Sequence, residues 1–188
     1  MQTRKDALID ALIAHLLERG LADLSLRPLA AATGTSARLL IYHFETKESL
    51  LAEVLETMQT RLRRSFAQLL APGTPKRQPQ PLKLLWQWAT ARRNYPYLKL
   101  LYELQILAIQ SPDTYAQYLQ RNASNWSDFI LAMLPAPRRD PAFATLCAAV
   151  FDGLFLELMS TGDRKRTTQA LDRFIRIAGD TPKQHAGA

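Results

Sequence analysis

The chain contains few of the residues from which catalytic and metal sites are usually built. Among its 188 residues there are one cysteine and three histidines, and the histidines (His15, His43 and His185) are widely separated. No phosphate-binding loop, nucleophile elbow or glycine-rich dinucleotide loop is present. Cys147 cannot form an internal disulfide, and its apolar neighbours predict a small buried side chain rather than a redox sensor. We therefore expect no enzyme, no metal and no cofactor.

Signals for membranes, secretion and β-structure are also scarce. No run of about 18 uninterrupted apolar residues exists, which argues against a membrane span. The first ten residues, MQTRKDALID, are charged and lead directly into a helical pattern, so they do not predict a secretory signal. Few stretches alternate with period two, and the chain has only 7 glycines. These absences predict a cytoplasmic, all-α protein that does not bind membranes, and the helical patterns described below number about nine.

The formal net charge of +7 is distributed unevenly along the chain. Residues 1–64 hold 9 Lys/Arg and 8 Asp/Glu, whereas residues 65–188 hold 15 and 9. A net positive charge is consistent with a polyanionic partner. The excess lies outside the segment that carries the motifs described next, so the net charge does not support DNA binding by that segment.

Two short helices separated by a glycine turn are predicted between Ser25 and Leu50. The Ser25 hydroxyl can cap the first helix, and Pro28 lies in its first turn, where a missing N–H costs little. Gly34 can end that helix because glycine adopts a left-handed backbone without steric cost. This is the order of elements in a helix-turn-helix, whose second helix enters the major groove of DNA.

The second of these helices is predicted over residues 37–43, with Thr35 or Ser36 as its cap. Three of its apolar side chains are expected in the core: Leu40, Ile41 and Phe44. A further helix is predicted to start at the cap Thr46 and to connect the first domain to the second, ending near residue 70. Its apolar residues recur with a helical period: Leu50, Leu51, Val54, Leu55, Met58 and Leu62.

A preceding helix completes this N-terminal unit. Its apolar stripe ends at Arg19-Gly20 and consists of Leu8, Ile9, Leu12, Ile13, Leu16 and Leu17. Four groups of residues then follow in a fixed order: Gly20 with Leu24-Ser25-Leu26, Leu29-Ala30 with Gly34-Thr35-Ser36, Tyr42-His43-Phe44, and Lys47-Glu48-Ser49-Leu50. On these groups, residues 4–58 resemble the N-terminal domain of the TetR family of bacterial transcription regulators. The family usually has an aromatic residue at the position of Ile41 and often a small one at that of Arg38, so a base preference cannot be transferred.

Nine residues are predicted to bind DNA: Ser25, Arg27, Thr35, Ser36, Ala37, Arg38, Tyr42, His43 and Lys47. Ser36, Ala37 and Arg38 lie where base edges are reached, and Arg38 could contact guanine with two hydrogen bonds, worth about 1–3 kcal/mol of discrimination. The other six would contact phosphates and set the register. The resemblance favours phosphate contacts for Tyr42 and Lys47, whereas a merely solvated surface position is the alternative for Arg27 and His43.

Proline-rich segments divide the chain. The predicted helix-turn-helix domain covers residues 1–50, with the connecting helix over about 46–70 and a flexible loop over 71–81. A second helical domain follows over 82–178, and residues 179–188 form a polar tail that is expected to fray. Within the second domain five helices are predicted, over residues 82–94, 96–110, 112–134, 142–161 and 164–178.

The helix over residues 142–161 is apolar on nearly every side, so it must be covered on all sides. A second copy of the chain could provide one covering, with the last two helices forming a four-helix bundle about a two-fold axis. The resemblance implies the same, because this family commonly forms dimers through those helices. A core helix inside a monomer is the alternative. The predicted dimer interface contains Val150, Gly153, Leu154, Leu158, Leu171, Phe174 and Ile175.

The resemblance also implies a small-molecule effector that enters the second domain and releases DNA. A mostly apolar pocket with a few polar groups suits an aromatic or lipophilic ligand, although aromatic residues at helical spacing also occur in ordinary cores. The predicted pocket residues are Trp86, Arg92, Tyr102, Glu103, Trp126, Phe129, Phe151 and Phe155.

The combined interpretation is a homodimeric regulator that binds a palindromic operator in double-stranded DNA. Repression is the commoner mode in the family that the chain resembles. An enzyme whose site is built from carboxylates and a helical adaptor that binds another protein are the competing classes. An enzyme would not bind one duplex sequence with salt-sensitive affinity, and an adaptor would be indifferent to Arg38.

Overall fold

A computed structural model describes residues 3–21, 25–69 and 80–180. Within these ranges the chain forms nine α-helices and one 3₁₀ helix, and no strand. This confirms the predicted all-α class. The helices are α1 (Arg4–Arg19), α2 (Leu26–Ala32), α3 (Ala37–Phe44), α4 (Lys47–Leu69), α5 (Pro81–Ala89), α6 (Tyr95–Gln110), α7 (Ala116–Met133), η1 (Ala136–Arg138), α8 (Pro141–Thr161) and α9 (Arg164–Asp180).

Two compact units divide these helices, and the division differs from the predicted one. The first unit comprises residues 1–74 and 91–124, and the second comprises residues 75–90 and 125–188. Helix α6 and the first half of α7 therefore belong to the same unit as the helix-turn-helix. Sequence order alone could not reveal this, because two segments separated along the chain share one core.

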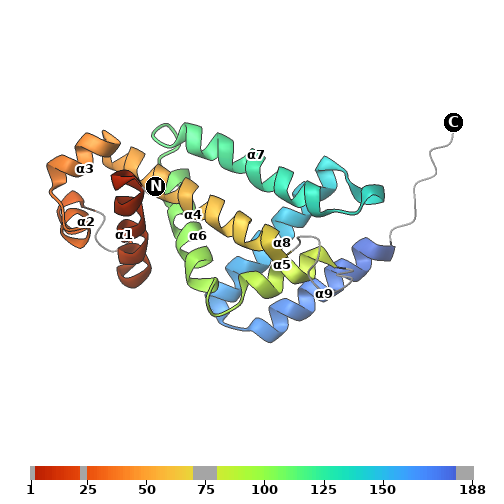
Figure 1. Cartoon of the computed structure of the whole chain (residues 1–188). Coiled ribbons are helices and arrows are strands. Elements are labelled where there is room, and N and C mark those ends of the chain that lie inside the picture. The colour runs from red at the N-terminus through yellow and green to blue at the C-terminus, as the bar shows by residue number, and fades with distance from the viewer. Residues whose placement is uncertain (1–2, 22–24, 70–79, 181–188) are drawn as a thin grey trace. The chain divides into compact units, whose positions relative to one another are not determined.

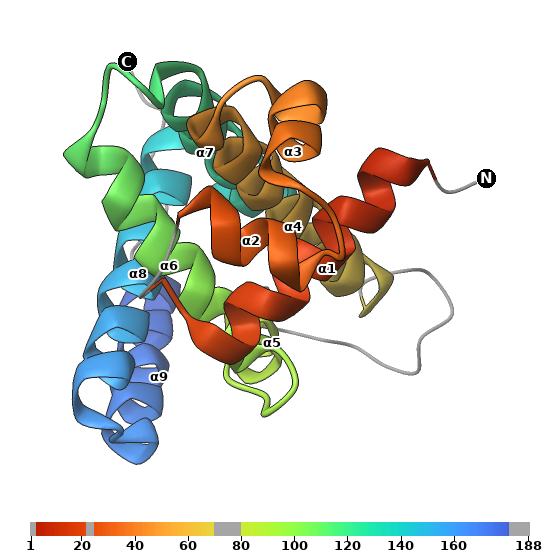
Figure 2. The ribbon, with the colours of Figure 1, turned by 90° about the vertical axis from the view of Figure 1, so that its left-hand side faces the viewer.

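In the first unit α1, α2 and α3 lie around the beginning of α4 (Figures 1 and 2). Helix α1 begins at a capping box, in which Thr3 Oγ1 accepts from the Asp6 N–H and the Asp6 carboxylate accepts from the Thr3 N–H. It ends at Gly20, where φ is +67°. Its predicted stripe is confirmed, since five of the six residues are buried and Leu17 is half-buried.

The helix-turn-helix has the predicted turn but not the predicted first cap. Gly34 has a φ of +61°, as its predicted role at the helix end requires. Ser25 occupies the N-cap position of α2 without a side-chain capping hydrogen bond, which corrects the prediction. The reason lies in Pro28, the third residue of α2, which lacks the N–H that an N-cap hydroxyl usually accepts from.

Helix α4 confirms both its predicted cap and its predicted stripe. The Ser49 N–H donates to Thr46 Oγ1 at 3.0 Å. All six predicted stripe residues are buried, from Leu50 to Leu62, and Phe66 extends the buried face by one more turn. The predicted loop over 71–81 lies outside the described residues except Gln80 and Pro81, and Pro81 begins α5 rather than ending the loop.

The second unit contains α5, the end of α7, α8 and α9. Helices α8 and α9 run antiparallel, joined at Gly162, whose φ is +68° (Figure 1). One core cluster joins the end of α7 to α5 and α8 through Leu82, Ile130, Leu134, Ala144 and Cys147.

Two predicted boundaries in the second half are wrong. The helix expected over 82–94 ends at Ala89, because Thr90 follows as a C-cap and its hydroxyl donates to the Trp86 carbonyl at 2.8 Å. The helix expected from Pro112 begins at Ala116, after a turn in which Thr114 and Tyr115 donate their N–H groups to Ser111. Helix α9 continues to Asp180, two residues into the predicted tail, and residues 181–188 lie outside the described part.

Candidate nucleic-acid interface and effector region

The recognition helix α3 turns one face to the core and the other to solvent. Ser36 is its cap and accepts from the Leu39 N–H at 3.2 Å. Leu40 and Phe44 are buried, whereas the Tyr42 side chain is 78% exposed. Ile41 is 37% exposed, so its predicted core position is wrong. It lies about 100° around the helix from the buried Leu40, toward the exposed side of α3.

All nine predicted DNA-binding residues belong to the first unit, on or beside α2, α3 and the start of α4. Five are exposed: Ser25, Arg27, Ser36, Arg38 and Tyr42. The other four are half-buried: Thr35, Ala37, His43 and Lys47. Thr35 Oγ1 is buried and has no hydrogen-bond partner among the described residues. Its hydroxyl therefore points inward in this structure and not toward a phosphate.

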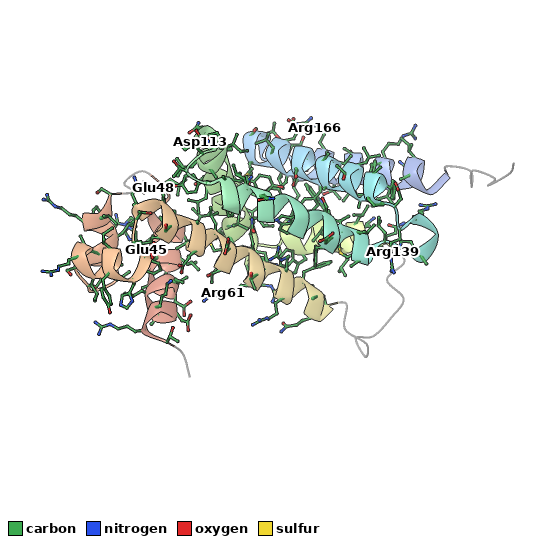
Figure 3. All side chains as sticks on the ribbon, turned by 90° about the horizontal axis from the view of Figure 1, so that it is seen from above. Glu45, Glu48, Arg61, Asp113, Arg139 and Arg166 are labelled. Carbon is green, nitrogen blue, oxygen red and sulfur yellow. The ribbon has the colours of Figure 1, made fainter. Side chains whose placement is uncertain are left out.

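A tight turn fixes the junction between α3 and α4. Glu45 has φ +67° and ψ −55°, and the Thr46 N–H donates to the Phe44 carbonyl at 2.7 Å. These values define a γ-turn with a positive φ, which is rare and strained for a residue with a side chain. Figure 3 shows Glu45 and Glu48 at this end of α4. The turn therefore sets the angle between α3 and α4.

Two ion pairs attach α1 to α4. Lys5 Nζ lies 2.6 Å from Glu53 Oε1 and 5.0 Å from the centre of the Phe44 ring, so it also contacts the recognition helix. Further along, Arg61 of α4 pairs with Asp10 of α1. These contacts are half-exposed, so each one contributes little to stability. Their value here is geometric, because they set the register of α1 on α4.

A buried polar network in the first unit was not predicted. Gln59 of α4 donates through Nε2 to the Tyr118 hydroxyl at 2.9 Å, and that hydroxyl donates to Gln105 Oε1 at 2.7 Å. Burial raises the pKa of Tyr118 well above its usual range, so its hydroxyl stays a donor. The network joins α4, α7 and α6. Helical periodicity could not reveal it, because a polar residue on a buried face has no sequence signal for its distant partner.

Two cavities occur in the first unit. The larger, of about 370 Å³, lies among α1, α4 and α6, and its lining includes Asp10, Ile13, Met58, Arg61, Leu62 and Tyr97. The smaller, of about 160 Å³, lies between the start of α4 and the end of α6, and its lining includes Lys47, Leu51, Leu107 and Tyr115. None of the eight predicted pocket residues lines either cavity.

The predicted pocket residues are split between the two units. Arg92, Tyr102 and Glu103 belong to the first, where Arg92 is exposed and Glu103 lies 3.7 Å from Lys99. The other five belong to the second: Trp86, Trp126, Phe129, Phe151 and Phe155.

Trp86, Phe151 and Phe155 form a close-packed aromatic cluster. The Trp86 ring lies edge-on to Phe151 at 5.7 Å and to Phe155 at 6.3 Å between centroids, and the two phenyl rings stack at 6.1 Å. All three side chains are buried. Trp86 Nε1 donates to Thr168 Oγ1 at 2.9 Å, so its polar atom is satisfied within the unit. This packing is that of a core, the alternative noted for aromatic residues at helical spacing.

Among residues 3–21, 25–69 and 80–180 no group of three or more His, Cys, Asp or Glu side chains is placed to hold a metal ion.

The predicted dimer residues differ in accessibility. Leu158 and Leu171 are buried within their own chain. Gly153 is exposed, and the remaining four are half-buried: Val150, Leu154, Phe174 and Ile175. Two further leucines of α8 are exposed and were not among the predicted residues: Leu146 and Leu156.

Within the described part of the chain α8 is the one helix long and apolar enough to cross a membrane by length and composition, and 28% of that window is buried. Core helices of globular proteins pass the same test. Two charged residues interrupt the apolar pattern of α8, Asp152 and Glu157, and Glu157 pairs with Arg166 of α9.

Comparisons with known proteins agree with this geometry. Residues 8–54 match the sequence family "Bacterial regulatory proteins, tetR family". No match was found among curated proteins. Several solved structures are similar over nearly the whole chain. The multidrug binding protein EbrR, complexed with ethidium, is 27% identical with a TM-score of 0.69, covering 91% of this chain and 98% of its own.

Two further structures agree. A TetR-family member from Streptomyces coelicolor A3 is 27% identical with a TM-score of 0.67, covering 91% of this chain and 98% of its own. A transcriptional regulator from Rhodococcus sp. Rha1 is 20% identical with a TM-score of 0.73, covering 93% and 95%. At 20% identity this last likeness concerns the fold alone.

Proposed function

Because the chain belongs to the TetR family of bacterial transcriptional regulators, we propose that it is a repressor that binds a palindromic operator as a homodimer. The chain is a DNA-binding regulator and not an enzyme. One observation carries the proposal further. The N-terminal end of α3 presents Ser36 and Arg38 to solvent, while Leu40 and Phe44 anchor the same helix in the core.

Contacts to bases and to phosphates come from different parts of this surface. Arg38 reaches base edges, flanked by Ser36 and Ala37. Phosphate contacts come from the periphery, chiefly from the exposed Tyr42 and from Lys47 at the start of α4, where the helix N-terminus also favours an anion. Ser25, Arg27 and His43 are the other phosphate contacts, and Thr35 joins them only if its hydroxyl rotates outward.

Dimer formation gives the protein two recognition helices. Helices α8 and α9 of each subunit form a four-helix bundle across a two-fold axis. The support for this arrangement is the apolar surface of α8 that its own chain leaves uncovered, which includes Leu146 and Val150. Two recognition helices about 34–36 Å apart read half-sites one turn apart on the same side of the duplex.

The effector is a small lipophilic or aromatic molecule, and the protein acts in the cytoplasm. EbrR, to which the chain is similar over most of its length, was solved in complex with ethidium and with proflavin, and this supports an aromatic ligand. Effector binding shifts α4, moves the recognition helices and lowers DNA affinity. By linkage, DNA weakens effector binding by the same factor.

The test is selection of bound duplexes from a random pool at moderate salt, with wild type, Arg38→Ala and Lys47→Ala side by side. We expect a palindromic site whose preferred bases change only in Arg38→Ala. Lys47→Ala is expected to weaken binding to all sequences alike and to reduce the salt dependence by about one charge. Binding without an enriched sequence, fading as salt rises, would contradict the proposal.

A further inference from the structure

The larger cavity is a groove built only from the first unit, and we name it the α1/α4/α6 groove. Its apolar wall consists of Ile13, Met58 and Leu62, all of them buried. Tyr97 of α6 also lines the groove and is 38% exposed. With a volume of about 370 Å³, the groove is in the range of small-molecule sites. Apolar side chains together with an accessible aromatic ring suit a flat, apolar ligand body.

The charge in this groove is an ion pair between α1 and α4. Asp10 and Arg61 both line the groove and pair with one another, and their side chains are 38% and 50% exposed. Figure 3 shows Arg61 on α4. A charged ligand in the groove therefore competes with one of the two partners.

The two side chains are not equally easy to displace. Arg61 has a long, flexible stem and can swing its guanidinium into water, where it is well solvated. Asp10 has a short side chain fixed on α1, so its carboxylate stays in the groove. A ligand cation can therefore take the place of Arg61, whereas a ligand anion would have to settle beside a carboxylate that cannot leave.

We propose that the α1/α4/α6 groove binds a flat aromatic cation, with its charge beside Asp10 in place of Arg61 and its rings between Tyr97 and the Met58–Leu62 wall. The inference rests on the proposed effector response and assigns the effector to this site. The Tyr97 ring adds a cation–π contact.

Binding at this site acts directly on the DNA-binding helices. The Asp10–Arg61 pair attaches α1 to α4, as does the Lys5–Glu53 pair nearer the beginning of α1. When the ligand displaces Arg61, α1 loses this attachment and keeps the Lys5–Glu53 pair and its apolar packing on α4. The register of α1 on α4 then changes, and with it the position of α3, which Lys5 contacts through the Phe44 ring.

The test uses the full-length protein and proflavin, a planar aromatic cation, followed by fluorescence titration without DNA because the dye intercalates. Asp10→Asn is expected to weaken proflavin binding about tenfold, as loss of a charged partner does. Arg61→Gln is expected to tighten it several-fold by removing the competing cation. Glu53→Gln is the matched control: it removes the same charge from the other ion pair, outside the groove, and is expected to leave the affinity unchanged.

Asp10→Asn is expected to lower the proflavin affinity and Arg61→Gln to raise it, whereas Glu53→Gln is expected to leave it unchanged. Together these results distinguish binding in the groove from a general effect of the protein's net charge. The inference is overturned if wild type does not bind proflavin, if Asp10→Asn binds it like wild type, or if Glu53→Gln weakens binding as much as Asp10→Asn. A melting curve checks that each variant folds. If Asp10→Asn does not fold, the proflavin affinity of Arg61→Gln tests the inference instead, and an affinity equal to that of wild type overturns it. Operator binding by the same preparations without dye tests the proposed function separately, so a failed groove site leaves that result standing.

Discussion

The single cysteine is buried in the core, and its burial changes the pKa of its thiol. Cys147 is 1% exposed and belongs to the core cluster of the second unit, beside Ala144 and Ile130. Burial disfavours the thiolate and raises the pKa of Cys147 to about 11. The thiol therefore stays neutral and unreactive in the folded protein.

This raised pKa predicts a pH-dependent contribution to stability. The unfolded chain ionises its cysteine near 9.0 and the folded chain near 11, so between these values the unfolded state binds fewer protons. The free energy of unfolding of wild type therefore falls as pH rises from about 9 to about 11. Cys147→Ala lacks this contribution, so the gap in urea midpoint between the two proteins is expected to narrow over that range. A constant gap from pH 8 to pH 11 would contradict the prediction.

At the scale of elements, the strained turn between α3 and α4 is open to direct test. Glycine adopts the φ of +67° found at Glu45 without steric cost, so Glu45→Gly is expected to stabilise the protein by about 1 kcal/mol in urea unfolding. Glu48→Gly, three residues on in the first turn of α4, is the matched control and is expected to destabilise the protein, because glycine is a poor helix former. If both variants destabilise equally, the turn is not strained.

Helix starts were the most predictable elements, because capping chemistry is local. Ser36 and Thr46 cap as expected, since each needs only an N–H three residues away. Ser25 does not cap for an equally local reason. The proline at the third helical position has no N–H to donate, whereas the prediction of a cap takes into account only that a proline is tolerated there. The start of α7 at Ala116 was missed because Pro112 tolerates a helix start without requiring one.

The site was less predictable than the fold. Positions on α3 followed from its periodicity except Ile41, whose 37% exposure depends on how far α1 and α4 extend around the helix. The predicted aromatic pocket rested on composition, which does not distinguish a lined cavity from the packed cluster around Trp86. The α1/α4/α6 groove joins Asp10 to Tyr97, residues too far apart in sequence for any periodic pattern to relate.

For the assembled protein, we propose that the uncovered surface of α8 forms the contact between two copies of the chain. Leu146 is 50% exposed, and it shares a helix face with Val150 and Gly153, four and seven residues on. Exposed leucines on a helix this apolar favour burial against a second copy of the chain. A dimer held there would be required for operator binding, because a single recognition helix reads only one half-site.

Leu146→Glu is therefore expected to produce a monomer and to lower operator affinity by a factor of about 100 or more, as loss of a bivalent contact does. The introduced carboxylate would have to lie in the apolar interface without a partner. Ile106→Glu is the matched control, because Ile106 is exposed to a similar degree, 48%, on α6 of the other unit. Sedimentation and operator titration measure both effects. A Leu146→Glu protein that stays dimeric, or an Ile106→Glu protein that becomes monomeric, would place the two-fold axis elsewhere than on α8 and α9.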